Sequence, residues 1–443
     1  MSTAAMPEFP AGFRWGVSTS AYQIEGGVDE DGRGASIWDT FAHSPGRIAD
    51  GSTGDVACDH YHRHAEDVAL LAGLGVSAYR FSIAWPRVRP TGDGPVDARG
   101  LDFYDRLVDD LLAHGVDPVA TLFHWDLPQW VEDAGGWLAR DTAHRFAEYA
   151  DATAARLGDR VKLWITLNEP FIHMSLGHGT GEHAPGRTLL FDAFPVAHHQ
   201  LLGHGLAVAA LRARTTSPIA IANSYSPVRA AGDGAADRAA VAAYEALHNR
   251  LFTDPLFGRG YPAELGFDTG VVRPGDLDVI AAPIDVLGVN YYNPTGVRAP
   301  QEGSPLPFEL VPLKGYPRTA FDWPVAPDGL HELLAWLRRT YGDDLPPIQV
   351  TESGCAYDDA PDADGRVHDP ERIAYLDGHL RAVHAAMAEG VDVTGYFVWS
   401  LLDNWEWAEG FTKRFGLVHV DFDTRLRTPK SSYAWFRDLI ARP

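Results

Sequence analysis

The sequence predicts an α/β fold, a single-domain (β/α)8 barrel of the TIM type, with an active site at the C-terminal ends of the strands. Three observations predict it. Eight short apolar runs end abruptly in polar residues, as parallel strands covered on both faces do. Amphipathic helical patterns lie between most of these runs. The chain has 443 residues, a length at which α/β barrels form one domain.

The expected strands are almost wholly apolar and rich in Val, Ile and aromatic residues, which favours strands buried on both faces. Eight strands alternating with helices is the number that closes a barrel. The strands are expected at residues 13–17, 76–81, 118–123, 161–167, 219–222, 286–289, 348–351 and 396–399.

Helices are expected where apolar residues recur at spacings of three and four, at 59–73, 100–114, 141–157, 192–214, 328–341 and 370–389. Gly75, Gly115, Gly158 and Gly390 follow such stretches, where helix ends favour glycine. A doubly wound open sheet is the alternative fold. It usually carries a phosphate-binding Gly-rich turn after a strand, which this chain lacks, and no Lys follows a Gly, which excludes a P-loop.

Two connections are unusually long, and such loops after barrel strands usually shape substrate sites. Residues 227–238 are rich in Ala, Gly and Asp, and disorder is the default expectation there. Residues 293–327 are rich in Pro, but Phe321 and Trp323 predict that something packs in this second connection.

Composition excludes several classes of protein. The 37 Lys and Arg against 60 Asp and Glu give a net charge of −23, which argues against nucleic-acid binding and against docking on an anionic membrane. Cys58 and Cys355 are the two cysteines and provide neither a disulfide scaffold nor a Cys-rich zinc site. No signal peptide is visible in residues 1–10, and no apolar run reaches about 18 residues. We therefore expect a cytoplasmic protein; homo-oligomerisation stays open.

Polar and aromatic residues collect at the expected strand ends, where barrel enzymes carry their chemistry. Glu169 and Glu352 follow the fourth and seventh strands, which lie across the barrel from one another. Either Glu alone could equally form a salt bridge, but two carboxylates among amides and indoles are the equipment of glycoside hydrolysis. The strand ends supply Gln23, Arg80, His124, Trp125, Asp126, Asn168, Glu169, Asn223, Asn290, Tyr291, Tyr292, Glu352, Trp399, Glu406 and Trp407.

At these residues the chain resembles glycoside hydrolase family 1, the β-glucosidases. The motifs run in family order from about Phe9 to the last helix, and together they leave little room for coincidence. They are FRWGVSTSAYQIEG (13–26), YRFSIAWPR (79–87), FHWDLP (123–128), TLNEP (166–170), HAPG (183–186), GVNYY (288–292), TESG (351–354) and WSLLDNWEWAEGF (399–411).

The resemblance implies a role for each site residue. Glu169 would be the general acid/base and Glu352 the nucleophile. Arg80, Asn290 and Tyr292 would orient Glu352, and no metal or cofactor is implied. The implied substrate-binding residues are Gln23, His124, Trp125, Asn168, Asn290, Tyr292, Trp323, Trp399, Glu406, Trp407 and Phe415.

Departures from the family pattern are small. Ser353 stands where Asn is usual, Trp405 where Phe is usual, and 18–20 reads Ser-Thr-Ser in place of Ala-Thr-Ala. Members that act on phosphorylated glycosides carry Ser where this chain has Glu406, so the resemblance implies a non-phosphorylated substrate even though Lys413 is present. His60 and His64 could hold a surface metal, but a packing role is expected because the HExxH pattern is missing.

The function predicted on this basis is a retaining β-glucosidase of carbohydrate metabolism and cellulose degradation. It would hydrolyse terminal non-reducing β-D-glucosyl residues of β-glucosides and cello-oligosaccharides through a covalent glycosyl-enzyme, with side activity on β-galactosides and β-fucosides. A non-catalytic sugar-binding member and a transglycosylase are the alternatives. Residues 9–440 would form the catalytic domain, after a short extension at 1–8.

Overall fold

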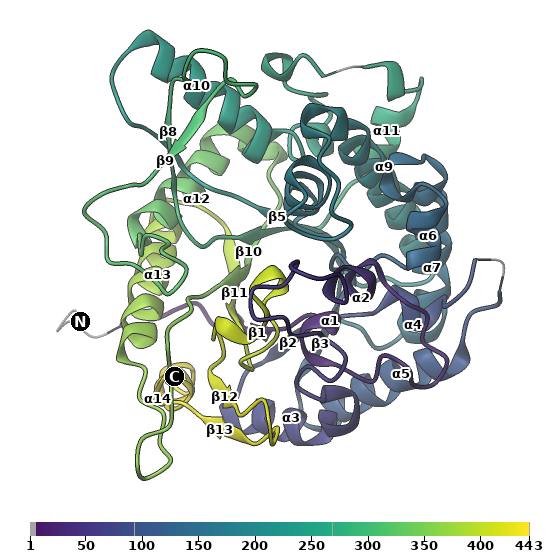
Figure 1. Cartoon of the computed structure of the whole chain (residues 1–443). Helices are drawn as coiled ribbons and strands as arrows, with labels where there is room; N and C mark the ends of the chain where they lie inside the picture. Colours follow the sequence, from purple (N-terminus) through teal and green to yellow (C-terminus); the bar gives the residue numbers. More distant parts are fainter. Residues whose placement is uncertain (1–5, 93, 268, 443) are drawn as a thin grey trace.

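Eight parallel strands close into a barrel in the computed structural model, which describes residues 6–92, 94–267 and 269–442 (Figure 1). The order around the barrel is β1-β11-β10-β7-β5-β4-β3-β2. The barrel strands are β1 (Arg14–Ser18), β2 (Ala78–Ser82), β3 (Asp117–Phe123), β4 (Leu163–Asn168), β5 (Ile219–Ser224), β7 (Val286–Asn290), β10 (Ile348–Ser353) and β11 (Val393–Trp399).

The predicted (β/α)8 class and all eight predicted strands are therefore confirmed, with boundaries that differ by at most three residues. The helices predicted from amphipathic spacing are also present around the barrel (Figure 1). They are α3 (His60–Leu74), α5 (Ala98–Ala113), α7 (Asp141–Leu157), α9 (Phe194–Arg212), α12 (Pro327–Tyr341) and α13 (Pro370–Ala388).

Glycine ends three of these helices in the predicted way. Gly75, Gly115 and Gly390 have φ angles of 77°, 74° and 92°, the left-handed backbone that closes a helix without a Cβ clash. Gly158 differs, because its φ is −64° and its amide hydrogen bonds the carbonyl of Ala154 within the helical geometry. Its lack of a Cβ serves packing instead, since a Cβ there would lie 2.5 Å from that carbonyl oxygen.

Shorter helices lie at the C-terminal ends of the strands and in the connections. The last helix, α14, packs next to α3 and α13. The shorter helices are α1 (Ala21–Ile24), α2 (Ile37–Ala42), α4 (Trp85–Val88), α6 (Gln129–Asp133), α8 (Pro170–Ile172), α10 (Ala235–Glu245), α11 (Asp276–Ile280) and α14 (Ser431–Ile440), with π-helical segments at η2 (His173–Thr180) and η4 (Ala246–Arg250).

The interior of the barrel is filled by small and branched side chains together with the ring of Phe397. A Cβ on Gly16 would lie 2.3 Å from that ring, so glycine is required where β1 passes Phe397. The packed interior closes the barrel below the site, as in other barrels of this kind. The interior cluster comprises Ala78, Val119, Leu163, Ile165, Ala220, Ala222, Val286 and Phe397.

The two long connections contain structure that the sequence did not predict. Residues 227–238 hold β6 (Val228–Ala230) and the start of α10, so the default expectation of disorder is wrong. β6 pairs with β8 (Thr295–Arg298), and β8 pairs with β9 (Glu309–Val311), both from the second connection. Phe321 and Trp323 stack with ring centroids 4.4 Å apart, as the prediction of packing required.

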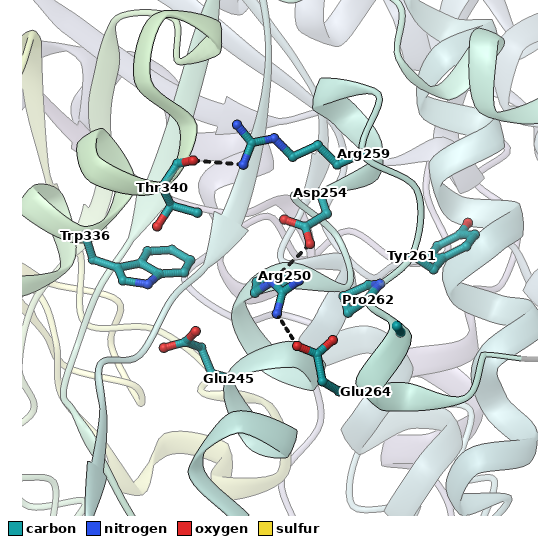
Figure 2. Close-up of a pocket in the computed structure, with 10 residues that line it drawn as sticks. Glu245, Arg250, Asp254, Arg259, Tyr261, Pro262, Glu264, Trp336 and Thr340 are labelled. Atoms are coloured by element: carbon teal, nitrogen blue, oxygen red, sulfur yellow. Dashed lines mark hydrogen bonds and ion pairs between the residues drawn. The ribbon is translucent and has the colours of Figure 1, made fainter. Parts of the chain in front are cut away.

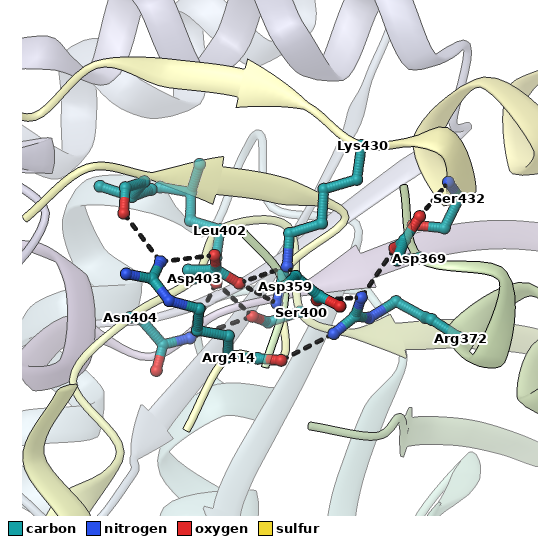
Figure 3. Close-up of polar contacts among 12 residues, drawn as sticks. Asp359, Asp369, Arg372, Ser400, Leu402, Asp403, Asn404, Arg414, Lys430 and Ser432 are labelled. Atoms are coloured by element: carbon teal, nitrogen blue, oxygen red, sulfur yellow. Dashed lines mark hydrogen bonds and ion pairs between the residues drawn. The ribbon is translucent and has the colours of Figure 1, made fainter. Parts of the chain in front are cut away.

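A buried ionic network anchors the loop that follows β11 (Figure 3). Lys430 directly follows the strand pair β12 (Val418–Val420) and β13 (Arg427–Pro429). Its ammonium group contacts Asp403 at 2.8 Å and Asp359 at 2.7 Å. Asp403 also pairs with Arg414 at 2.9 Å and accepts the Gly416 amide at 2.9 Å. The network therefore ties both ends of the segment 403–416 to one buried cation.

Candidate active site

Two glutamates meet in one cavity of about 400 Å³ at the C-terminal ends of the barrel strands. Glu169 directly follows β4 and precedes α8, while Glu352 is the penultimate residue of β10. Both side chains line the cavity and both are nearly inaccessible to solvent. The pairing of β10 with β7 shifts register between Val350 and Glu352, and such irregularities re-aim side chains at the rims of barrels.

Glu352 is held by two neighbours. The guanidinium of Arg80 donates to Oε1 at 2.6 Å, and the hydroxyl of Tyr292 donates to Oε2 at 2.8 Å. Arg80 itself is fixed by hydrogen bonds to Thr121 and to the carbonyl of Thr351. The carboxylate of Glu352 is thus oriented from both oxygens.

Asn168, the residue before Glu169, forms hydrogen bonds with several residues of the site. Its Oδ1 accepts from Arg80 at 2.6 Å and from Asn290 at 3.0 Å, while its Nδ2 lies 3.0 Å from Nε2 of His124. Burial lowers the pKa of His124 well below its usual range, so the ring is neutral and accepts that amide proton. Trp125 also contacts this residue, because its indole N–H donates to the carbonyl of Asn168 at 2.9 Å.

The two carboxyl groups have different electrostatic surroundings. Burial, and next the charge of Glu352, raise the pKa of Glu169 to about 8. Burial also raises the pKa of Glu352, but the Arg80 guanidinium and the Tyr292 hydroxyl oppose that rise. Neighbouring groups that push two pKa values apart mark an acid and a nucleophile or base. These surroundings favour the proton on Glu169 over the proton on Glu352.

A third carboxyl group belongs to the loop after β11. Glu406 accepts a hydrogen bond from Nε2 of Gln23 at 3.1 Å, and the same amide donates to Asn404 at 3.1 Å. Burial and the charge of Glu352 raise the pKa of Glu406 to about 8. Asn404 is bonded in turn to Ser400, so the first and eighth strands share one polar cluster at the cavity floor.

Aromatic rings form the walls of the cavity. Trp125 and Trp407 lie 4.6 Å apart between centroids, and His124 stacks against Trp399 at 5.8 Å. On the opposite side Trp323 contacts Tyr292, with centroids 5.4 Å apart. Flat apolar surfaces beside hydrogen-bonding groups suit the two faces of a pyranose ring.

Three non-glycine residues of the cavity have left-handed backbone. The φ angles are 43° at Glu169, 77° at Trp125 and 50° at Trp407. Such conformations cost of order 1–3 kcal/mol each and cluster at functional sites. All three side chains line the cavity, so the strain accompanies the placement of the acid and of two aromatic walls.

Most of the predicted residues line this cavity, and four lie immediately behind its wall. Gln23, Arg80, Asn168 and Asn290 are almost fully buried. The first three contact lining residues by hydrogen bonds, and Asn290 donates to Asn168. The predicted residues that line the cavity are His124, Trp125, Glu169, Tyr292, Trp323, Glu352, Trp399, Glu406, Trp407 and Phe415.

Sequence reasoning missed other lining residues. Ser224 lines the cavity at the end of β5, whereas Asn223, the strand-end residue singled out from the sequence, points away and donates to the carbonyl of Phe252. The alternation of strand side chains carries that signal. His248 comes from a π-helical segment, for which the sequence has no marker. The missed residues include Ile172, Leu176, Glu182, His183, Ser224, Tyr225, Ser226, His248, Asn293, Thr295 and Glu409.

His60 and His64, the two histidines considered for a surface metal, each have a carboxylate neighbour. His60 is buried with Nδ1 2.8 Å from Asp67, and His64 lies 3.3 Å from Asp110. Within the described residues, no group of three or more His, Cys, Asp or Glu side chains is placed to hold a metal ion. In the same part of the chain, no helix combines the length and apolarity needed to cross a bilayer.

A closed parallel barrel whose mouth holds two buried carboxyl groups, both with raised pKa values, between aromatic walls defines a glycoside hydrolase. The family model described as glycosyl hydrolase family 1 matches residues 5–443. The chain belongs to glycosyl hydrolase family 1.

Similar proteins cover nearly the whole chain. A thermostable beta-glucosidase B of Thermobispora bispora is 52% identical over 98% of this chain and 91% of its own length. A bifunctional beta-D-glucosidase/beta-D-fucosidase of Bifidobacterium breve is 47% identical over 98% of each chain. The structure of a family 1 β-glucosidase from Thermotoga maritima in complex with isofagomine lactam has a TM-score of 0.94 and 42% identity, over 98% of this chain and 99% of that one.

Proposed function

We propose that this enzyme is a retaining β-glucosidase, which removes terminal non-reducing β-D-glucosyl residues from β-glucosides and cello-oligosaccharides. The observation that carries the proposal is the pair Glu169 and Glu352 in one aromatic-walled cavity, of which only Glu352 is held by a guanidinium and a phenol. The names of the similar proteins support glucosides as substrates. Because both glutamates are present, a non-catalytic sugar-binding role is not favoured.

The reaction has two steps. Glu352, ionised and oriented by Arg80 and Tyr292, attacks the anomeric carbon while Glu169 donates its proton to the departing glycosidic oxygen. A covalent bond forms between Glu352 and the sugar, and the bond to the aglycone breaks. Glu169 then removes a proton from a water molecule, which attacks the anomeric carbon and releases Glu352 as a carboxylate.

The change of role at Glu169 follows from its electrostatic partner. The negative charge of Glu352 is a cause of the raised pKa of Glu169. When Glu352 becomes an ester that charge disappears, and the pKa of Glu169 falls. The group that was an acid in the first step is then a base in the second, without any movement of the backbone.

The remaining predicted residues form the sugar subsite in this proposal. Gln23 and Glu406 would bind sugar hydroxyls at the cavity floor, Trp399 would stack on the ring, and Trp323 would face the aglycone. The name of the Bifidobacterium breve relative supports β-fucosides as additional substrates; β-galactosides are a further expected side activity. Glu406 offers no cation to a 6-phosphate, which disfavours a 6-phosphorylated sugar.

The proposal extends to the domain and its setting. Residues 9–440 would form the catalytic domain, because the ring of Phe9 already packs on Phe13 and Trp15 at centroid distances of 4.7 and 4.9 Å. The extension at 1–8 falls largely on residues 1–5, which lie outside the described residues. The unpaired, buried state of Cys58 and Cys355 supports a cytoplasmic location. A role in cellulose degradation is proposed because cello-oligosaccharides are among the proposed substrates.

Azide rescue tests the assignment of the nucleophile. Glu352→Ala should lose activity on p-nitrophenyl β-glucoside, and added azide should restore turnover with an α-glucosyl azide as product, because azide attacks from the vacated face. Glu169→Ala should instead give a β-glucosyl azide. The opposite pair of products would reverse the two roles, and the absence of any β-glucoside turnover by the intact enzyme would reject the proposal.

A further inference from the structure

A second cavity, of about 560 Å³, lies on the outer flank of the barrel and shares no lining residue with the catalytic cavity (Figure 2). It is formed between the C-terminal half of α12 and the segment 245–264, which begins at the end of α10. We call it the outer pocket and define it by Glu245, Arg250, Asp254, Arg259, Glu264 and Trp336.

Both arginines of the outer pocket already have hydrogen-bond or ion-pair partners. Arg250 contacts Asp254 at 3.0 Å and Glu264 at 2.8 Å. Arg259 donates to the carbonyl of Thr340 at 2.8 Å and lies 3.4 Å from Asp344. Since neither guanidinium is free, and three carboxylates line the same pocket, an anion such as phosphate would be repelled.

One acceptor in the pocket has no partner. The carboxylate of Glu245 forms no hydrogen bond or ion pair with the described part of the chain, and Figure 2 shows it below Trp336 without a contact line. Burial raises the pKa of Glu245, which indicates that solvent only partly reaches it. A ligand that completes this site must therefore donate hydrogen bonds to this carboxylate, and a hydroxylated neutral molecule does so without displacing the paired guanidiniums.

The half-buried indole of Trp336 provides the flat surface that such a ligand needs. It makes an edge contact with Tyr341, with centroids 6.0 Å apart, and the nearby guanidinium of Arg259 lies over Tyr341, not over Trp336. A second flank cavity contains Trp130 and offers a contrast, because Arg145 covers that ring at 5.1 Å and the indole N–H is taken by the carbonyl of Arg89. Within the described residues, a guanidinium lies over the ring of Trp130, whereas Trp336 lines its pocket with no cation over its ring.

We propose that the outer pocket is a second carbohydrate-binding site, which takes a neutral mono- or disaccharide on Trp336 with a hydroxyl donated to Glu245. A sugar ring supplies an apolar C–H face for the indole and hydroxyls for the carboxylate and the ionic pairs. The pocket is large enough for a disaccharide. The site is independent of the proposed reaction, because none of its residues lines the catalytic cavity.

Fluorine NMR of enzyme labelled with 5-fluorotryptophan tests this site residue by residue. The Glu352→Gln variant serves as background so that cellobiose is not consumed, and Trp336→Phe and Trp130→Phe assign the two flank signals. Cellobiose should shift the Trp336 signal saturably and leave the Trp130 signal unmoved. Glu245→Ala should raise the apparent Kd at Trp336 about tenfold, the loss of a hydrogen bond to a charged group, whereas Glu148→Ala beside Trp130 should not.

The alternatives have distinct outcomes. A Trp336 signal that stays fixed up to tens of millimolar cellobiose overturns the proposal, and so does a signal that responds equally to methylammonium or inorganic phosphate. A shift that is unaffected by Glu245→Ala also overturns it. The signals of Trp399 and Trp407 report the catalytic cavity separately, so silence there counts against the proposed function and not against the outer pocket.

Discussion

Glu169 and Glu352 are both nearly inaccessible to solvent, but their neighbours differ. Glu352 receives hydrogen bonds from Arg80 and Tyr292, whereas burial, and next the charge of Glu352, raise the pKa of Glu169 to about 8. The proposed mechanism therefore assigns the proton of the free enzyme to Glu169 and the negative charge to Glu352. This is the state from which glycosyl transfer to Glu352 can begin.

The pH dependence of the reaction should report this arrangement. For cellobiose, whose leaving group needs a proton, kcat/KM should fall as the pH rises through about 8, because Glu169 then loses its proton in the free enzyme. A pH–rate profile of kcat/KM measures this limb. A profile that stays flat to pH 9 would contradict the assignment of the acid.

A substrate whose leaving group needs no proton provides the control for that experiment. Glu169→Gln should lower kcat/KM for cellobiose by about 10²–10⁴-fold, the usual contribution of a general acid. The same variant should lose far less of its rate of glycosylation by 2,4-dinitrophenyl β-glucoside, whose leaving group needs no proton. Burst-phase release of dinitrophenolate separates that step from the slowed hydrolysis of the glycosyl-enzyme. Equal losses with both substrates would show a general distortion of the site.

At the scale of elements, the loop after β11 carries Glu406, Trp407 and Phe415 into the cavity, and its regular structure is the short 3-10 helix η9 (Trp407–Thr412). Its position depends on the buried network around Lys430 (Figure 3). Asp403 at the start of the loop contacts Lys430 and Arg414, and the amide of Gly416 closes the far end on the same carboxylate. A fully paired network of this kind rigidifies the segment that it holds.

Removing the central cation should therefore destabilise the protein. Lys430→Met leaves Asp359 and Asp403 buried with one partner fewer, and breaking such a pair costs about 3–5 kcal/mol of the free energy of unfolding. Urea unfolding followed by tryptophan fluorescence measures the loss. Lys314→Met, at an exposed position, is the matched control and should stay within about 0.5 kcal/mol of the parent.

The barrel elements could be predicted from the sequence because parallel strands covered on both faces leave short apolar runs that end in polar residues. The connection between β5 and β7 could not. Its helix α10 is Ala-rich and continues into the π-helical segment η4, and a pattern of Ala and Gly indicates neither a strand nor an amphipathic face. The three-stranded sheet of β6, β8 and β9 joins segments more than 60 residues apart, which local patterns do not reveal.

Some residues of the candidate site could likewise be predicted from the sequence, and others could not. Glu169, Glu352 and Trp399 sit at strand ends, so the barrel topology alone predicts that they converge. Ser224 was missed by one residue, because side chains alternate along β5 and Asn223 points outward. His248 reaches the cavity from 24 residues further along the chain, where it lies 3.4 Å from Ser224. Only the three-dimensional packing brings those two residues together.

At the scale of the whole molecule, the distribution of histidine is a source of acid sensitivity. Six buried histidines are kept neutral by burial, which lowers their pKa values in the folded chain. His178 and His379 fall to about 4, while His183, His204 and His248 fall to about 3, and His173 lies well below its usual value. An unfolded chain would protonate all six near pH 6.5.

The folded state therefore binds fewer protons than the unfolded state between about pH 4 and 6.5. Stability from these histidines is complete above pH 6.5 and falls on acidification, by about 1.4 kcal/mol per pH unit for each group. Glu169 and Glu406, with pKa values of about 8, change stability in the opposite sense over this range, because they take up protons only when folded.

The contribution of these six histidines to the free energy of unfolding should drop steeply between pH 6.5 and 5, in opposition to the carboxyl groups with raised pKa values, among them Glu169, Glu352 and Glu406. The double variant His204→Gln/His379→Gln should reduce that drop by about 2–3 kcal/mol per pH unit, because two of the buried sites no longer titrate. His114→Gln, at an exposed position, should leave the slope as it is. Urea midpoints measured at pH 6.5, 6 and 5 decide the matter: equal slopes in the parent and the double variant would show that the loss of stability comes from other groups.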